Sequence, residues 1–176
     1  LNGTTNNSSP VQVGTSSWTA VAAEYIASAA IRLDNALFTW GYAASGQLGN
    51  NNTSITYSSP VQLGTSSYVQ LTGANQFFFA TTSQYVLYAW GLNNNGQLGT
   101  SDTTNRSSPV QIGSSSWNYV AAGGLTVLAI RTDGALFEWG ATYDTNVSGF
   151  RSSPVQVGTS SWTTIWTGTF YSVGIT

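Results

Sequence analysis

A unit of about fifty residues is repeated along this chain of 176 residues, and the repetition limits the fold more than any other feature. Pro-Val-Gln recurs at intervals of 50, 49 and 45 residues, beginning at Pro10, Pro60, Pro109 and Pro154. Trp-Gly recurs at intervals of 50 and 49 residues, as Trp40-Gly41, Trp90-Gly91 and Trp139-Gly140. We therefore expect a single repeat domain over residues 1–176, with units at roughly 1–41, 42–91 and 92–140 and an incomplete unit at 141–176.

Each unit contains short runs of residues that are typical of β-strands. In the first unit, Ala27–Leu33 is almost entirely apolar, as in a strand that is covered on both faces. The other strands of this unit are expected at Val11–Gly14, Trp18–Ala22 and Ala36–Trp40, the last after a two-residue turn at Asp34-Asn35. The equivalent pair Asp133-Gly134 favours a type I′ turn, because Gly accepts a positive φ. Four short strands per unit without a helical period predict an all-β fold of propeller-type blades, about 3.5 in number, as a partial or oligomer-completed propeller.

The repeated residues have a physical role in such a fold. A small sheet cannot bury both of its faces alone, so neighbouring blades must stack on it. We expect the Trp of each Trp-Gly pair to lie between blades, with the Gly beside it allowing a sharp turn. We expect each Pro of Pro-Val-Gln just before the first strand of its unit, where the missing N–H costs little.

The composition excludes several functional classes. Charged residues make up 6% of the chain, and the sequence contains no Lys, His or Cys. Four Arg residues cannot form the basic cluster that binds nucleic acid. No His or Lys can activate the many Ser and Thr hydroxyls, and no thiolate can hold a metal. We therefore expect no catalytic residues, no cofactor and no nucleic-acid partner, and no apolar run reaches the ~20 residues that span a bilayer.

The acidic residues and the polar loops offer little chemistry. Asp34 and Asp133 occupy the same turn in two units, which explains both without catalysis. Glu24 stands where the repeat has Gly, and Glu138 precedes Trp139; these two acids lie outside turns and loops, and we expect neither to be catalytic. The loops at Asn50–Asn52 and Ser101–Thr103 supply oxygen atoms but few carboxylates, so we expect no metal site.

Three tyrosines are the best candidates for contacts with a binding partner. Tyr42, Tyr57 and Tyr143 lie in loops after Trp-Gly or before Ser-Ser-Pro, where the repeat does not require an aromatic core residue. Tyr together with Asn is common in recognition surfaces. Packing of these loops on their own blade is an equally good explanation.

The repeat resembles that of the regulator of chromosome condensation family. The third copy carries almost the whole family pattern, as Trp90-Gly91, Gly96-Gln97-Leu98-Gly99, Pro109-Val110, Trp117, Val120-Ala121-Ala122-Gly123, Ala129-Ile130, Asp133-Gly134 and Trp139-Gly140. The resemblance covers essentially the whole chain, and it implies a β-propeller, commonly of seven blades.

The chain departs from the family in two respects. Where the family usually has His, the four copies have Ala27, Phe77, Thr126 and Tyr171, so a polar contact between blades is missing. Because exchange factors of this family also rely on His and charged loop residues, we expect no exchange activity on a small GTPase. Some 3.6 units cannot close a seven-bladed ring, which leaves three arrangements: part of a longer chain, two copies in one ring, or open ends paired with neighbouring subunits.

Two functions remain open at this point. The first is a non-enzymatic structural or assembly module of an extracellular or virion surface, such as a fibre, appendage or coat, with partners that are copies of itself or neighbouring subunits. The second is a binding propeller, adhesin or inhibitor-like, that grips a protein or glycan receptor. A neutral surface rich in hydroxyl and amide groups favours an extracellular or particle location for either.

Overall fold

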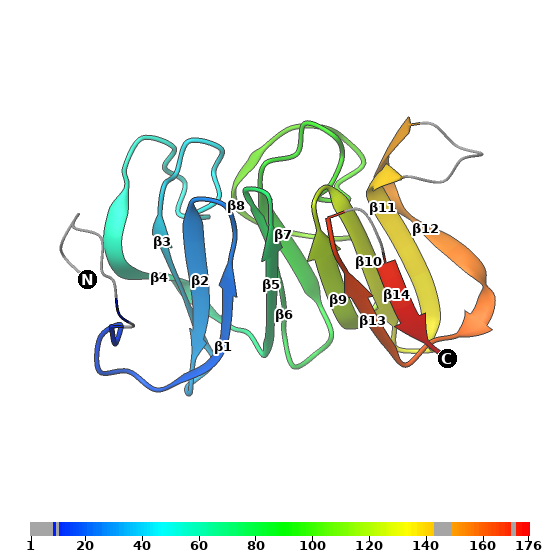
Figure 1. The fold of residues 1–176 in the computed structure, drawn as a ribbon, viewed down its shortest axis with the longest axis horizontal. Helices are drawn as coiled ribbons and strands as arrows, with labels where there is room; N and C mark the ends of the chain where they lie inside the picture. Colours follow the sequence, from blue (N-terminus) through cyan, green and yellow to red (C-terminus); the bar gives the residue numbers. More distant parts are fainter. Residues whose placement is uncertain (1–8, 10, 143–148, 170–171) are drawn as a thin grey trace.

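The computed structural model describes residue 9 and residues 11–142, 149–169 and 172–176. Within these residues, every regular element is a β-strand. The strands form three four-stranded sheets and one two-stranded sheet, all antiparallel. The sheets follow one another in chain order as adjacent blades (Figure 1). The prediction of an all-β fold with three complete blades and one partial blade is therefore confirmed.

The strands of each blade pair in chain order. Blade 1 consists of β1 (Trp18–Ala23), β2 (Ala27–Arg32), β3 (Ala36–Gly41) and β4 (Tyr57–Ser67). Blade 2 consists of β5 (Gln70–Ala74), β6 (Phe77–Thr81), β7 (Leu87–Gly91) and β8 (Arg106–Gln111). Blade 3 consists of β9 (Trp117–Gly123), β10 (Thr126–Arg131), β11 (Ala135–Thr142) and β12 (Gly149–Ser161). The partial fourth blade is the hairpin of β13 (Thr164–Thr167) and β14 (Ser172–Ile175).

The prolines of Pro-Val-Gln lie inside strands, not before the first strand as predicted. Pro60, Pro109 and Pro154 fall within β4, β8 and β12, the last strand of each blade. The pairing of β3 with β4 shifts register between Thr39 and Gly41, opposite the segment that contains Pro60. An edge strand with such an irregularity tolerates the N–H that proline lacks.

Residues Val11–Gly14 form no strand, so the strand predicted there is wrong. The equivalent segments in β4, β8 and β12 each pair with the Trp-Gly strand that precedes them. No Trp-Gly dipeptide precedes Val11 in the sequence. Within the described residues this segment has no preceding Trp-Gly strand as a partner, and a lone strand leaves its backbone groups unsatisfied.

The turn at Asp133-Gly134 is also not of type I′. Gly134 has a φ of 88°, but Asp133 is not among the described residues with a positive φ. The Gly134 N–H donates to the Arg131 carbonyl at 2.9 Å, which defines a four-residue turn that ends at the glycine. Asp133 instead uses its carboxylate, which accepts from the Ala135 N–H at 3.2 Å and pairs with Arg131.

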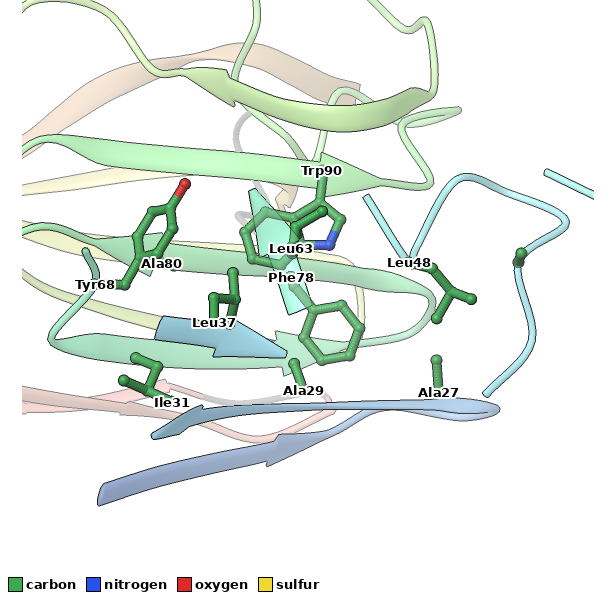
Figure 2. Close-up of a cluster of buried hydrophobic side chains, with 11 residues drawn as sticks. Ala27, Ala29, Ile31, Leu37, Leu48, Leu63, Tyr68, Phe78, Ala80 and Trp90 are labelled. Atoms are coloured by element: carbon green, nitrogen blue, oxygen red, sulfur yellow. The ribbon is translucent and has the colours of Figure 1, made fainter. Parts of the chain in front are cut away.

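The hydrophobic core lies between the blades. Between blades 1 and 2, Ala27, Ala29 and Ile31 of β2 face Phe78 and Trp90 of blade 2 (Figure 2). The rings of Phe78 and Trp90 stack with centroids 5.8 Å apart and are fully buried. A second cluster of the same design joins blades 2 and 3. Each blade is therefore stabilised mainly by the apolar area that it shares with its neighbours.

In blades 1 and 2, a Gly-Gln-Leu-Gly loop covers the Trp-Gly tryptophan of the next blade. Trp90 Nε1 donates to the Gln47 carbonyl at 2.9 Å, and Trp139 Nε1 donates to the Gln97 carbonyl at the same distance. Gly49 has a φ of 68°, and a Cβ there would lie 3.0 Å from the Trp90 ring. The motif thus supplies a carbonyl for the indole and a glycine that lets the loop lie against it.

Candidate binding surfaces

The first strands of successive blades form a shallow groove, here called the inner groove. β1 contacts β5, β5 contacts β9, and β9 contacts β13. The groove encloses about 400 Å³, and its aromatic lining residues are Tyr119 and Trp166. Gln70 Nε2 donates to the Asn118 carbonyl at 2.9 Å, which ties β5 to β9 along the groove. A groove of this volume with aromatic walls fits a small ligand or a segment of another protein.

Trp166 departs from the repeat at its position. The equivalent residues of the three complete blades are Ala22, Thr72 and Ala121, all smaller than Trp. Trp166 is 50% exposed, whereas Ala121 is buried. At this position in blade 3, Ala121 belongs to the buried cluster that blade 3 shares with Ile165 of the fourth blade. Because Trp and Tyr contribute most per residue to binding interfaces, Trp166 is the best candidate contact in the groove.

The tyrosines predicted from the sequence lie in different environments. Tyr42 follows β3 and is 48% exposed. Tyr57 begins β4 opposite Gly41 and packs, partly buried, against the core between blades 1 and 2. Tyr143 lies outside the described residues. Of these three, Tyr42 is thus the one that the structure describes as an exposed aromatic side chain.

A second exposed tyrosine, Tyr25, lies near Tyr42. Tyr25 is 81% exposed in the turn between β1 and β2, and the Tyr42 N–H donates to the carbonyl of the next residue, Ile26, at 3.0 Å. The equivalent turn residues in the other blades are Asn75 and Gly124. The pair Tyr25 and Tyr42, here called the rim tyrosines, is specific to blade 1.

Both acids that the repeat did not explain have structural partners. Glu24 accepts hydrogen bonds from the Gln76 N–H at 2.9 Å and the Ile26 N–H at 3.2 Å, and so it bridges blades 1 and 2. Burial raises the pKa of the Glu24 carboxyl, although these backbone N–H groups oppose the shift. Glu138 pairs with Arg151 at 3.4 Å between β11 and β12. Each of the two residues therefore has a partner within the fold.

In the polar loop at Ser101–Thr103, Asp102 uses its oxygen atoms in contacts within the loop. The Asn93 amide donates to Thr100 Oγ1, the carbonyls of Asp102 and Thr104, and Asp102 Oδ1, at 3.0 to 3.2 Å. Asp102 also pairs with Arg106 at 2.5 Å. Across the described ranges, no three His, Cys, Asp or Glu side chains gather as a metal site would require. The same ranges contain no helix long and apolar enough to cross a membrane.

Sequence reasoning did not find Tyr25, Tyr119 or Trp166. Each differs from the residues at the same position in the other units, so a comparison of the copies position by position would have marked all three. The groove itself could not be found in this way. It depends on how neighbouring blades are placed, which the strand pattern of a single unit does not contain.

These features define an open β-propeller whose blades are joined by tryptophans and Gly-Gln-Leu-Gly loops. The sequence profile of the regulator of chromosome condensation (RCC1) repeat matches residues 34–80 and 86–130, which is more than half of the chain. The chain belongs to this repeat family. No curated protein sequence matches it significantly.

Solved structures share the fold at low sequence identity. Human WBSCR16 is similar over 94% of this chain, with a TM-score of 0.81 and 21% identity. Yeast RCC1 (Prp20), solved with Kap60 bound, is similar over 94% of this chain, with a TM-score of 0.75 and 18% identity. The ectodomain of the Physcomitrella patens receptor kinase CR4 is similar over 92%, with a TM-score of 0.59 and 17% identity. The chain spans 46%, 43% and 38% of these three chains, respectively.

Proposed function

We propose that this chain is a non-enzymatic propeller module that binds other proteins and assembles with neighbouring subunits on an extracellular or particle surface. The observation that carries the proposal is the inner groove. It combines about 400 Å³ of open space with the exposed ring of Trp166, which the repeat does not require. Desolvation of such a ring by a partner is a common source of binding energy.

The structural neighbours support protein binding as the general function. Yeast RCC1 (Prp20) was solved with Kap60 bound, and a study of Prp20p concerns its binding to Gsp1p and histones. Kap60, Gsp1p and histones are named there as partners of the yeast protein. For this chain, the shared fold favours a surface that recognises protein, and the chemistry of its own residues must select the partner.

The surface chemistry supports the extracellular or particle location and the absence of catalysis. With 6% charged residues, the chain must present mainly hydroxyl and amide groups to solvent. Glu24 and Glu138 are engaged in contacts that hold the fold, and the sequence contains no His, Lys or Cys. A surface of this kind suits permanent contacts between subunits better than proton transfer.

Binding to the secreted and particle fractions of the source organism tests this function. The immobilised chain should retain a specific protein, and Trp166→Ala should weaken that binding about tenfold, or ~1.4 kcal/mol. Leu33→Ala is the matched control, because Leu33 is 69% exposed and does not line the groove. Equal binding by both variants would contradict the proposal, and so would the absence of any retained protein.

The rim tyrosines favour a glycan receptor as a second candidate. Exposed aromatic rings can stack on sugar rings, and Tyr25 is 81% exposed. On a glycan array, Tyr25→Ala and Tyr42→Ala should each abolish a signal that the unaltered chain gives. Tyr85→Ala is the control, because Tyr85 is 48% exposed in the turn between β6 and β7. An array without signal would exclude this candidate.

A further inference from the structure

A cavity of about 360 Å³ lies between blades 1 and 2, both of which are complete four-stranded sheets. Its lining includes Leu63 and Ser66 of β4, Pro109 of β8, and the two tyrosines Tyr68 and Tyr88. We name this cavity the tyrosine cleft. The described residues that line it do not overlap with those that line the inner groove, so it is a separate site.

The aromatic pair in the tyrosine cleft differs from the pair at the same place in the other complete blades. Blade 2 has Tyr68 with Tyr88, whereas blades 1 and 3 have Trp18 with Phe38 and Trp117 with Phe137. In all three blades the two rings meet edge to face, with centroids 5.2 to 5.8 Å apart. Tyr in place of Trp therefore keeps the packing of the pair but removes one ring of the indole, which leaves space between the blades.

The indole also supplies a hydrogen bond that Tyr68 cannot supply. Trp117 Nε1 donates to the Ile112 carbonyl at 3.4 Å, and the equivalent tryptophan of blade 1 makes the same bond at the same distance. Leu63 is the equivalent of Ile112, and Tyr68 has no ring N–H to donate to its carbonyl. Compared with the interface between blades 2 and 3, the cleft thus lacks one ring and one donor.

The cleft is neutral. Among the described residues that line it, none carries a charge. In blade 3, Arg131 lies over the Phe137 ring at 5.1 Å, but the equivalent of this arginine in blade 2 is Thr82. No guanidinium therefore covers Tyr88 from that position. An uncharged ligand suits such a site, because a buried charge without a partner is costly.

The hydroxyl of Tyr68 is available as both donor and acceptor. Figure 2 shows it directed away from Ile31 and Leu37, which belong to the same core cluster as the Tyr68 ring. Burial raises the pKa of Tyr68, and the neighbouring Tyr88 adds to this shift, although a hydrogen bond with Ser66 opposes it. The hydroxyl stays protonated, and it gives the mostly apolar cleft a polar group that can orient a ligand.

We propose that the tyrosine cleft binds a small uncharged aromatic molecule that carries one N–H or O–H donor, of the indole or phenol type. The ligand ring takes the space that an indole ring fills in blade 3. Its donor reaches the Leu63 carbonyl, as Trp117 Nε1 reaches the Ile112 carbonyl. Cavities left by a smaller side chain in a protein can hold aromatic molecules. This site goes beyond the binding of protein partners and is independent of it.

Titration of the full chain with a fluorinated indole, followed by fluorine NMR, tests the proposal. We expect saturable binding with a Kd below about 1 mM. A fluorinated benzofuran has the same ring shape but no N–H, and it should bind at least fivefold more weakly. Equal affinity for the two would contradict the contact with the Leu63 carbonyl. The absence of saturable binding by the indole would overturn the proposal.

The matched variant is Tyr68→Trp, which introduces the residue that blades 1 and 3 have at this position. It fills the space and supplies the donor, so it should weaken the binding of the fluorinated indole at least tenfold. Tyr85→Trp is the control, because Tyr85 is 48% exposed and does not line the cleft. The melting temperatures show whether both variants fold. Unchanged affinity in a folded Tyr68→Trp chain would mean that the indole binds elsewhere.

Photolabelling of the unaltered chain decides the question if Tyr68→Trp does not fold. An indole that carries a diazirine should label residues 63–68 and 108–109, which contribute to the cleft. Mass spectrometry of the digested chain locates the label. Labelling that is concentrated in other segments, or spread evenly along the chain, would overturn the proposal.

Two further outcomes separate this proposal from its alternatives. Trp166→Ala should leave the affinity for the fluorinated indole unchanged, and a tenfold loss would place the ligand in the inner groove instead. N-acetyltryptophanamide, which imitates a tryptophan side chain within a protein, should bind more weakly than indole. If it binds more tightly, the occupant of the cleft is a side chain of a partner protein, and the proposed ligand is wrong.

Discussion

Asp34 and Asp133 occupy the same turn position in blades 1 and 3, and each pairs with an arginine two residues earlier. The Nη2–Oδ2 distances are 2.7 Å for Arg32–Asp34 and 2.6 Å for Arg131–Asp133. The hydrogen bond from the arginine lowers the pKa of each carboxyl to about 2, from an ordinary value of 3.8. A carboxyl whose pKa is lower in the folded state than in the unfolded state stabilises the fold at pH values above its unfolded pKa. This contribution is lost as the pH falls through the folded pKa.

The first prediction concerns Asp133→Asn. The melting temperature of the unaltered chain should exceed that of the variant at about pH 5, and the difference should shrink between about pH 4 and pH 2. Gln84→Asn is the control, because Gln84 takes the same turn position in blade 2 and the residue two before it is Thr82. A difference that is independent of pH would contradict the assigned role of the ion pair.

The second prediction concerns Glu24, whose pKa shifts in the opposite direction. Burial raises the pKa of Glu24 above 4.5, so the folded state holds the proton more tightly than the unfolded state does. Its stabilising contribution is therefore complete below the unfolded pKa and is lost as pH rises through the folded pKa. In Glu24→Gln, the decrease in melting temperature from about pH 4 to pH 7 should be smaller than in the unaltered chain. An identical decrease would show that Glu24 does not titrate in this way.

At the scale of elements, the loop between β7 and β8 is organised around one buried side chain. Asn93 has no exposed area; its amide donates to four oxygen atoms of the loop, and its carbonyl accepts from the Leu98 N–H at 2.9 Å. This loop also holds Gln97 against Trp139. The position of one amide therefore affects the interface between blades 2 and 3.

The third prediction follows from this arrangement. Asn93→Ala should lower the free energy of unfolding by about 2–3 kcal/mol, because it leaves buried partners unsatisfied. Asn94→Ala, a change at the exposed neighbouring position, should stay within about 0.5 kcal/mol. Denaturant titration of both variants measures the difference. Equal stability of the two would mean that the loop is not held by Asn93.

The strands were predictable from the sequence because each one is bounded by a turn and recurs in every unit. The ranges expected for β1, β2 and β3 differ from the observed ones by a single residue at one end. The place of the Pro-Val-Gln strand was not predictable, because it pairs across a long loop with the strand before it and not with the one that follows. The turn at Gly134 was misjudged because the carboxylate of Asp133 selects a different geometry.

The candidate site was predictable only in part. Tyr42 was identified because its loop has no aromatic requirement, and it is exposed. Tyr57 satisfied the same criterion, but it packs against the core between blades 1 and 2. Trp166 was not identified from the sequence. Its exposure follows from the placement of β13 beside β9, which is a property of the assembled blades.

At the scale of the whole molecule, stability should vary from blade to blade. Blade 2 is covered on both faces, whereas the face of blade 1 that points away from blade 2 and the two-stranded fourth blade have uncovered apolar residues. Exposed examples are Val21 in blade 1 and Val173 and Ile175 in β14. Because each blade depends on its neighbours, the end blades should open more readily than the middle one.

Amide hydrogen exchange measured strand by strand tests this account most directly. The account predicts that the central strand β6 exchanges at least tenfold more slowly than β2 and β14 under native conditions. A dilution series establishes whether the exchange rates depend on association between copies. Protection of β2 and β14 equal to that of β6, at every concentration, would contradict the account, because it would mean that both ends of the row of blades are covered within the single chain.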